Sequence, residues 1–268
     1  MVKIVSGKIF IKATICCFCM FLMACSDADD SKIKTTKPKF SLVKTPEVNK
    51  DSVFYFVQKQ VDFGPRTPNS IAHEKCADWM VEKLKSYNFK IIEQKGKQLA
   101  YDGKELVYRN IIGRFGLKKK RRIMLSAHWD TRPWADQDVA KVDEPIDGAN
   151  DAGSGVAVIL EIARLLNEQS PNIGVDIVLF DIEDYGKSND TFCYGSQIWS
   201  KDTRLDSLIP IYGINLDMVG DPNALFIYEE YSQKYARPIL DKVWTIAKHM
   251  GYSRYFKVIP DGQIIDDH

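Results

Sequence analysis

The chain has 268 residues, and its 37 lysines and arginines almost balance its 36 aspartates and glutamates, which gives a formal net charge of +1 at pH 7. A chain so close to neutral carries no charge signature of a nucleic-acid-binding protein. The length suits one domain of roughly 220 residues behind a leader and a tether, and the sequence contains no internal repeat.

The first 24 residues have the pattern of a secretory signal peptide. Three lysines precede an uncharged apolar stretch over residues 13–24, which is too short to span a bilayer. The stretch ends in Leu-Met-Ala-Cys, which resembles the lipobox of bacterial lipoproteins, where the signal peptidase cuts before a cysteine that receives lipid. We therefore expect lipid on Cys25. An uncleaved anchor is the alternative, and both place the protein outside the cytoplasm.

Residues 25–48 are expected to be an acidic start followed by a flexible tether. The run Ser26–Asp30 resembles an export signal of Bacteroidetes lipoproteins, which indicates the periplasmic side or the cell surface of a Gram-negative bacterium. Residues 31–48 are rich in Lys, Thr, Ser and Pro and lack apolar periodicity. Only Cys76 and Cys193 remain after the signal and the lipid site, and the sequence leaves open whether they form a disulfide.

Residues 49–268 form the expected folded domain, in which helical patterns alternate with short β-branched runs. The expected helices cover residues 52–61, 70–87, 151–168, 194–200 and 234–250. The expected strands cover residues 97–101, 106–113, 122–127, 175–181, 211–216, 224–228 and 255–259. Asp102-Gly103 predicts a hairpin between the first two strands, and the helices between later strands predict parallel crossovers. The sequence thus favours an α/β fold, a three-layer α/β/α domain with a mixed, mostly parallel central sheet.

Acidic side chains stand where several of these strands end. Glu183 and Asp184 follow the strand at 175–181, His128 follows the strand at 122–127, and Asp217 follows the strand at 211–216. A fourth acid, Asp151, lies among glycines at the start of a helix. The carboxyl ends of parallel strands are where α/β enzymes place their chemistry, so these side chains together predict a metal site.

Each of these residues also has an ordinary structural interpretation. Asp151 is able to cap its helix without binding a metal. Glu183 and Asp184 are compatible with a solvated turn, but two adjacent carboxylates at a strand end are costly unless a cation compensates them, and one can then bind the metal while the other moves protons. We expect His128 to bind a second metal or to orient a ligand. His73 and His249 lie in helical stretches and are assigned no role.

The ordered set of motifs resembles one enzyme family. The motifs are Gly64-Pro65-Arg66, Ala127–Thr131, Asp147–Gly155, Phe180–Gly186, Tyr194–Ser196, Leu216–Gly220 and Asp266-Asp267-His268. They occur in the order seen in glutaminyl cyclases of the zinc aminopeptidase-like superfamily, and the bacterial, animal-like glutaminyl-peptide cyclotransferases are the most similar branch. The resemblance runs from about Ser52 to His268.

The resemblance implies a zinc-dependent reaction in which an N-terminal glutamine of a peptide becomes pyroglutamate and ammonia is released. It assigns Asp151 and Asp184 as ligands of one zinc ion, although many relatives carry Glu at the second position. It makes Glu183 the catalytic carboxylate and places Asp217 and Asp266 around the substrate amine and the reacting amide. The expected partners are peptide or protein N-termini that bear glutamine, with no nucleic acid and with the membrane contacted through lipid.

Two alternatives remain open at this stage. A zinc aminopeptidase would use His128, Asp151, Asp184 and Asp217 to hold two metals. A truncated, inactive relative is the other alternative, because family members continue beyond Asp-Asp-His into a Trp-His-Thr loop whose histidine is the third zinc ligand, absent from this chain. The apolar mouth that a peptide substrate needs is expected at Trp129, Trp134 and Tyr185.

Overall fold

The computed structural model describes residues 41–202, 204 and 210–268. The expected signal peptide, the lipid site at Cys25 and most of the tether therefore lie outside the described residues. Leu42–His268 forms one compact unit. No helix in the described ranges combines the length and the apolar character needed to cross a membrane.

The described chain folds into five α-helices and seven β-strands. The helices are α1 (Lys50–Val61), α2 (Ile71–Ser86), α3 (Gly153–Glu168), α4 (Tyr194–Lys201) and α5 (Glu230–His249). The strands are β1 (Lys90–Leu99), β2 (Glu105–Phe115), β3 (Arg122–His128), β4 (Gly174–Phe180), β5 (Gly213–Asn215), β6 (Phe226–Tyr228) and β7 (Phe256–Pro260). Every expected element is present. The largest differences are that β1 begins seven residues earlier than expected and that β5 has only three residues.

Five strands form one mixed sheet in the order β1-β2-β4-β3-β5. β1 and β2 form the expected hairpin, closed by a turn in which Gly103 has φ +83°. β2 also pairs antiparallel with β4, whereas β4, β3 and β5 are parallel. The mixed sheet is confirmed, but parallel pairing makes up half of its pairings rather than most of them, because the long hairpin contributes two antiparallel contacts. β6 and β7 pair parallel in a separate two-stranded sheet that contacts α5.

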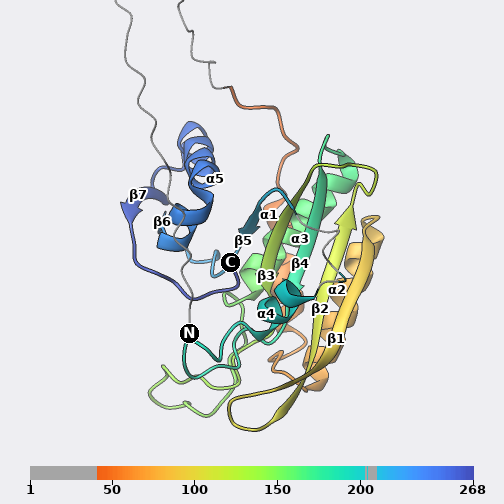
Figure 1. Ribbon diagram of the computed structural model, residues 1–268, viewed down its shortest axis with the longest axis vertical. Coiled ribbons are helices and arrows are strands. Elements are labelled where there is room, and N and C mark those ends of the chain that lie inside the picture. Colours follow the sequence, from red (N-terminus) through yellow and green to blue (C-terminus); the bar gives the residue numbers. More distant parts are fainter. Residues whose placement is uncertain (1–40, 203, 205–209) are drawn as a thin grey trace, which may run out of the picture. The chain divides into compact units, whose positions relative to one another are not determined.

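Helices cover both faces of the five-stranded sheet, as expected for three layers (Figure 1). α2 packs on β1 and β2, α3 packs on β3, and α1 packs on α3, whereas α4 lies on the other face against β2. The residues of β4 alternate between the two cores: Ile177 and Leu179 join the large cluster under α2 and α3, while Val178 and Phe180 pack near Trp199 of α4. Because both faces are covered, all seven residues of β4 are buried.

A buried ion pair ties the three central strands together at the end where β4 begins. The Asp176 carboxylate of β4 accepts hydrogen bonds from Arg122 Nε at 2.7 Å and Nη2 at 2.6 Å, and from Arg114 Nε at 3.0 Å. Arg122 also donates to the carbonyl oxygen of Phe115 at 2.8 Å. Two-point contacts of this kind are strong and directional, so the pair fixes how β2, β3 and β4 align.

We expect Asp176→Asn to lower the free energy of unfolding by about 3 kcal/mol, because it leaves the buried Arg122 guanidinium without a counter-charge. Glu144→Gln is the control, since it breaks the exposed Lys141–Glu144 pair and should cost less than about 1 kcal/mol. Guanidinium-induced unfolding of the two variants measures both. Equal losses would show that the buried pair does not stabilise the sheet more than a surface pair does.

Candidate metal centre

The carboxyl ends of β3, β4 and β5 meet at one edge of the sheet because these three strands are parallel. His128 is the last residue of β3 and pairs in register with Phe180, the last residue of β4. Asp217 follows β5 after one residue, and Asp151 lies in the loop just before α3. The structure therefore brings together the acidic and histidine positions that the strand pattern singled out.

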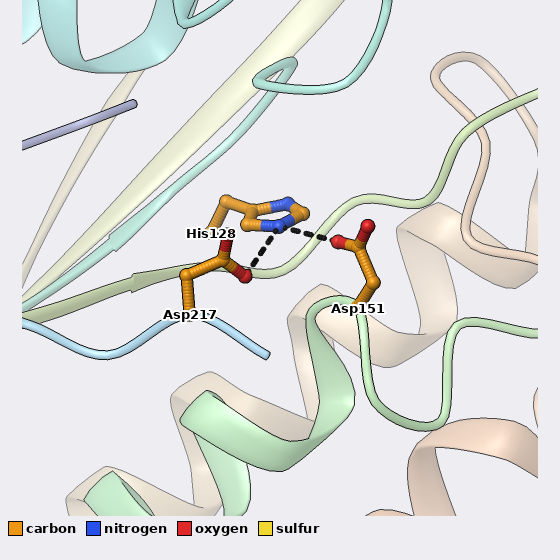
Figure 2. A group of neighbouring side chains, drawn as sticks. All are labelled: His128, Asp151 and Asp217. Atoms are coloured by element: carbon orange, nitrogen blue, oxygen red, sulfur yellow. Dashed lines mark ion pairs between the residues drawn. The ribbon is translucent and has the colours of Figure 1, made fainter. Parts of the chain in front are cut away.

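His128, Asp151 and Asp217 form a tight group (Figure 2). His128 Nε2 lies 2.8 Å from an Asp151 carboxylate oxygen and 3.4 Å from an Asp217 oxygen, and one ligand atom from each residue lies within 4.8 Å of the others. Burial alone would lower the pKa of His128, but the carboxylates of Asp130, Asp151 and Asp217 outweigh it and raise the pKa well above its usual value. Two carboxylates and an imidazole converging on one point are a typical donor set for a divalent metal.

The loop that carries Glu183 and Asp184 is held in place by Asp130. The backbone N–H of Glu183 donates to Asp130 Oδ1 at 3.0 Å, and that of Asp184 donates to Oδ2 at 3.2 Å. Ile182, just before them, has φ +48°, a left-handed conformation that is uncommon for a β-branched residue. The sequence analysis gave Asp130 no role of its own; its position two residues after His128 at the end of β3 was the available signal.

Asp184 is buried and Glu183 is half-buried, and both carboxyl groups have raised pKa values. Burial, reinforced by the charge of Asp184, raises the pKa of Glu183 to about 9. Burial, reinforced by the charge of Asp151, raises the pKa of Asp184 to about 8. Asp184 Oδ2 has no hydrogen-bond partner in the described part of the chain, whereas Glu183 Oε1 accepts from the Cys193 thiol at 3.2 Å. Carboxyl groups in this condition favour the approach of a cation.

The C-terminal motif contributes two further carboxyl groups. Asp266 accepts a hydrogen bond from Asn215 Nδ2 at 2.8 Å, and its pKa is raised by burial and by the charge of Asp217. Burial raises the pKa of Asp267 to about 7, although the charge of His128 and the Ser196 hydroxyl group act in the opposite direction. Asp267 was not expected to have a role. His268 is directed at Glu229, with 3.1 Å between Nε2 and Oε2.

The Gly-Pro-Arg motif has a structural role, because its arginine, Arg66, clamps the loop after β3 to the loop before α3. Its buried guanidinium donates to the carbonyl oxygens of Trp129 at 3.1 Å, Asp147 at 2.8 Å and Gly148 at 2.7 Å. Gly148 has φ +63°, and a Cβ there would lie 2.2 Å from the Thr131 methyl group. Glycine is thus required where this loop turns toward α3, and the clamp fixes the chain just before Asp151.

The loop after β5 is attached directly to the start of α3. The backbone N–H of Gly220 donates to Asn150 Oδ1 at 2.8 Å, and that of Val219 donates to Ser154 Oγ at 3.0 Å. These two bonds hold the segment that carries Asp217 beside the segment that carries Asp151, which is why the two carboxylates reach the same imidazole nitrogen.

The sequence suggested that Trp129 lines the mouth of the site, but the structure places it in the core. Its indole is fully buried and stacks on His73 with ring centroids 4.3 Å apart. His73, to which the sequence assigns no role, is itself buried. Its Nε2 atom lies 2.7 Å from Oδ1 of Asp181, the residue that follows β4. Tyr185 is also buried, in a cluster with Ala100, Leu106 and Ile182. Of the three expected aromatic residues only Trp134 is half-buried, and it packs on Tyr185 with ring centroids 5.0 Å apart. Cys76 and Cys193 are free thiols, so they form no disulfide.

The donor set fits a zinc ion by its chemistry. Imidazole nitrogen and carboxylate oxygen are the usual zinc ligands where thiolates are absent. One oxygen of each of two carboxylates, Asp184 Oδ2 and Asp217 Oδ1, has no hydrogen-bond partner among the described residues. Of the two ligands implied by the resemblance, Asp151 belongs to the tight group, and Asp184 lies close enough for the Asp151 charge to raise its pKa. Asp217, expected beside the substrate, and His128 complete the group.

Residues 110–268 match the model of peptidase family M28. Among solved structures, the chain is similar to a zinc-dependent exopeptidase from Parabacteroides distasonis, with 44% identity, a TM-score of 0.81 and coverage of 84% of this chain and 80% of that chain. It is also similar to a glutaminyl cyclase from Bacteroides thetaiotaomicron, with 43% identity, a TM-score of 0.82 and coverage of 84% of this chain and 80% of that chain. A glutaminyl cyclase from Tannerella forsythia has 45% identity, a TM-score of 0.81 and coverage of 83% of this chain and 80% of that chain.

A curated relative, the uncharacterised protein YfbL of Escherichia coli, is 36% identical over 77 residues, which are 29% of this chain and 23% of that protein. The solved structures match most of the described chain, whereas this relative matches a small part of it. The likenesses confirm the zinc exopeptidase-like fold that the motifs implied. Together with the donor set, they identify zinc as the metal of the site.

We expect Asp151→Asn to weaken zinc binding at least about 100-fold, because it removes a charged ligand that also pairs with His128. Asp221→Asn is a matched control on an exposed carboxylate of the neighbouring loop. Competition with a chromogenic chelator gives the zinc dissociation constants of both variants. Unchanged affinity in Asp151→Asn would place the metal elsewhere.

We also expect the metal-free protein to lose stability as the pH rises from about 5 to 9. The folded-state pKa values of Glu183, Asp184 and Asp267 are raised to about 9, 8 and 7, while unfolded carboxyl groups titrate near 4. The folded state therefore binds more protons than the unfolded state between these limits, and the stability present below about pH 4 is lost as pH rises.

The chelator-treated wild type and Glu183→Gln provide the comparison for this pH dependence. Glu183→Gln removes one of the titrating groups, so its melting temperature should fall less between pH 5 and pH 9 than that of the wild type. Parallel curves for the two proteins would mean that Glu183 does not titrate with a raised pKa.

Proposed function

The chain belongs to peptidase family M28, and from this membership and the site we propose that it is a zinc-dependent glutaminyl-peptide cyclotransferase. The reaction converts an N-terminal glutamine of a peptide to pyroglutamate and releases ammonia. The observation that carries this proposal is Glu183, a half-buried carboxyl group that Asp130 holds beside the metal residues through the backbone of its loop. The likeness to glutaminyl cyclases at 43% and 45% identity supports the choice of substrate.

The chemistry requires one proton to move from one nitrogen to another. The α-amine nitrogen of the glutamine forms a bond to the γ-carbonyl carbon, and the bond from that carbon to the amide nitrogen breaks. Zinc, when bound, polarises the γ-carbonyl group. Glu183 takes the proton that the amine loses and returns it to the departing nitrogen, which leaves as ammonia. No water is consumed, and one carboxyl group serves both proton transfers.

The other carboxyl groups suit the positioning of the substrate amine. Asp217 and Asp266 are electrostatically coupled, since the charge of Asp217 raises the pKa of Asp266. Asn215 fixes the Asp266 carboxylate through its side-chain amide. A positively charged or hydrogen-bonding amine between the two acids relieves their repulsion, which directs the amine toward the γ-carbonyl group.

The surroundings of the site fit a peptide chain that begins with glutamine. Trp134 is half-buried and packs on Tyr185, whose hydroxyl group donates to Asp102 at the tip of the β1–β2 hairpin at 2.9 Å. Arg132 lies over the Trp134 ring at 5.8 Å and donates to the backbone carbonyl of Asp184. Trp134 and Arg132, both half-buried, offer contacts to the residues that follow the glutamine, so we propose peptide and protein N-termini as the partners.

We further propose that the protein is a lipoprotein that acts outside the cytoplasm. The support is the sequence alone: a basic and then apolar leader that ends in Leu-Met-Ala-Cys25, followed by an acidic run. The lipid would anchor the domain to the membrane through the tether. Labelling of cells with a radioactive fatty acid, with Cys25→Ala as the comparison, tests this: loss of label in the variant supports the proposal.

A zinc aminopeptidase is the second candidate, and the group of His128, Asp151 and Asp217 is the observation that favours it. With Asp184, these residues supply enough ligands for two metals, and Glu183 would then activate a water molecule. The similarity to an exopeptidase from P. distasonis is compatible with this alternative. The two candidates differ in their product, which is an amino acid in one case and ammonia in the other.

The decisive experiment measures zinc content and ammonia release from a glutamine-initiated dipeptide, with the chain from Ser26 to His268 and its Glu183→Gln variant. We expect bound zinc in both proteins and a loss of kcat of at least about 100-fold in the variant, because the proton-transferring group is removed. Glu144→Gln, an exposed substitution, should behave as wild type. Hydrolysis of Leu-amide without ammonia release from the dipeptide would establish the aminopeptidase, and the absence of zinc and of turnover would contradict both candidates.

A further inference from the structure

The turn between β2 and β3 carries a run of basic residues that the site does not use. Residues 118–122 read Lys-Lys-Lys-Arg-Arg. Arg122 is buried in the pair with Asp176, whereas Lys118, Lys120 and Arg121 are exposed and Lys119 is half-buried. Within the described ranges, none of these four has an acidic side chain at ion-pair distance, unlike most lysines and arginines of β1 and α3.

Lys90 at the start of β1 extends this charge across the neighbouring strand. It is exposed, and it lines a shallow hollow together with Asn88, Arg114 and the lysines at 118 and 119. We call Lys90 and residues 118–121 the basic surface. Asp176, which lies near the start of β4, is buried and already neutralised by Arg114 and Arg122, so the surface carries uncompensated positive charge in a chain whose net charge is close to zero.

The basic surface lies at the opposite end of the sheet from the metal centre. β3 begins at Arg122, directly after the basic run, and ends at His128 in the metal site. Seven residues of strand span roughly 20 Å. A flat partner on the basic surface therefore leaves the carboxyl ends of β3, β4 and β5 open to solution (Figure 1).

The N-terminal segment of the domain is attached at the same end as the basic surface. Residues 43–46 lie against the C-terminal part of α3, at Ile162, Leu165 and Leu166, and the backbone N–H of Asn49 donates to Glu161 at 2.8 Å. α3 starts beside the metal centre and ends near the loop that leads into Gly174, which pairs in register with Arg122. The chain that leads back to Cys25 thus joins the domain next to the basic surface.

We propose that the basic surface docks on anionic phospholipid headgroups of the membrane that holds the lipid anchor, and that this contact keeps the metal centre turned toward solution. The inference rests on the lipid anchor proposed above only for its biological setting, because the surface itself lies in the described domain. Each lysine or arginine near an anionic bilayer strengthens binding by about a factor of five, and the attraction falls within a Debye length. A short tether with weak electrostatic docking orients the domain without a second lipid.

Co-sedimentation with vesicles tests the basic surface without the lipid. The chain from Ser26 to His268 retains the compact unit Leu42–His268 and is incubated with phosphatidylcholine vesicles with or without phosphatidylglycerol at low ionic strength. We expect binding to the anionic vesicles alone and its loss at high salt. The variant with Lys118, Lys119, Lys120 and Arg121 each changed to Gln should bind at least about 100-fold more weakly.

The matched control changes three lysines and one arginine on α5 and in the turn before β7, namely Lys234, Lys242, Lys248 and Arg254, each to Gln; all four are exposed. It should bind like the wild type, and both variants should keep the wild-type melting temperature. Ammonia release in solution, measured on the same samples, separates a failed docking surface from a failed enzyme. Equal loss of binding in both variants, no binding of the wild type, or binding only to soluble polyanions such as heparin would overturn the proposal.

Discussion

The electrostatic cost of gathering carboxylates is the constraint on which the site depends. Seven acidic side chains converge there: Asp130, Asp151, Glu183, Asp184, Asp217, Asp266 and Asp267. In the described part of the chain, His128 and Arg132 form ion pairs with them. The protein meets part of this cost by keeping protons on buried and half-buried acids, as the raised pKa values of Glu183 and Asp184 show. A zinc ion meets the rest, so metal binding and the protonation of the site are one linked equilibrium.

The scaffold resists this repulsion with neutral contacts more than with counter-charges. Asp130 accepts two backbone N–H groups of the Glu183 loop, and Asn150 and Ser154 receive those of the Asp217 loop. A Cβ at Gly155 would lie only 2.0 Å from a carbonyl oxygen of the chain just before Asp217. The absence of a side chain there lets α3 approach β5 closely. Backbone groups, rather than cations, thus set the distances between the acids.

The sequence predicted what depends on local pattern and strand ends. The strand pattern placed His128, Glu183 and Asp217 at one edge, and the Asp102-Gly103 turn predicted the hairpin, because these follow from the direction of parallel strands and from local turn chemistry. It did not establish that Trp129 is core or predict that His73 pairs with Asp181, since these contacts join α2 to the ends of β3 and β4, which lie 56 and 108 residues further along the chain. The early part of β1 was missed because its one buried residue, Gln94, is polar and is held by hydrogen bonds rather than by apolar packing.

The same residues are able to serve cyclisation or peptide hydrolysis, and the difference lies in what reaches Glu183. Hydrolysis needs a water molecule at this carboxyl group, whereas cyclisation needs the substrate's own amine there. The Cys193 thiol donates to Glu183 Oε1, and Asp130 fixes the loop that carries Glu183. In the proposed reaction, an amine held between Asp217 and Asp266 would take the place of a water molecule at the other carboxylate oxygen. Because an intramolecular nucleophile reacts at a very high effective concentration, a substrate that reaches this position cyclises before water replaces its amine.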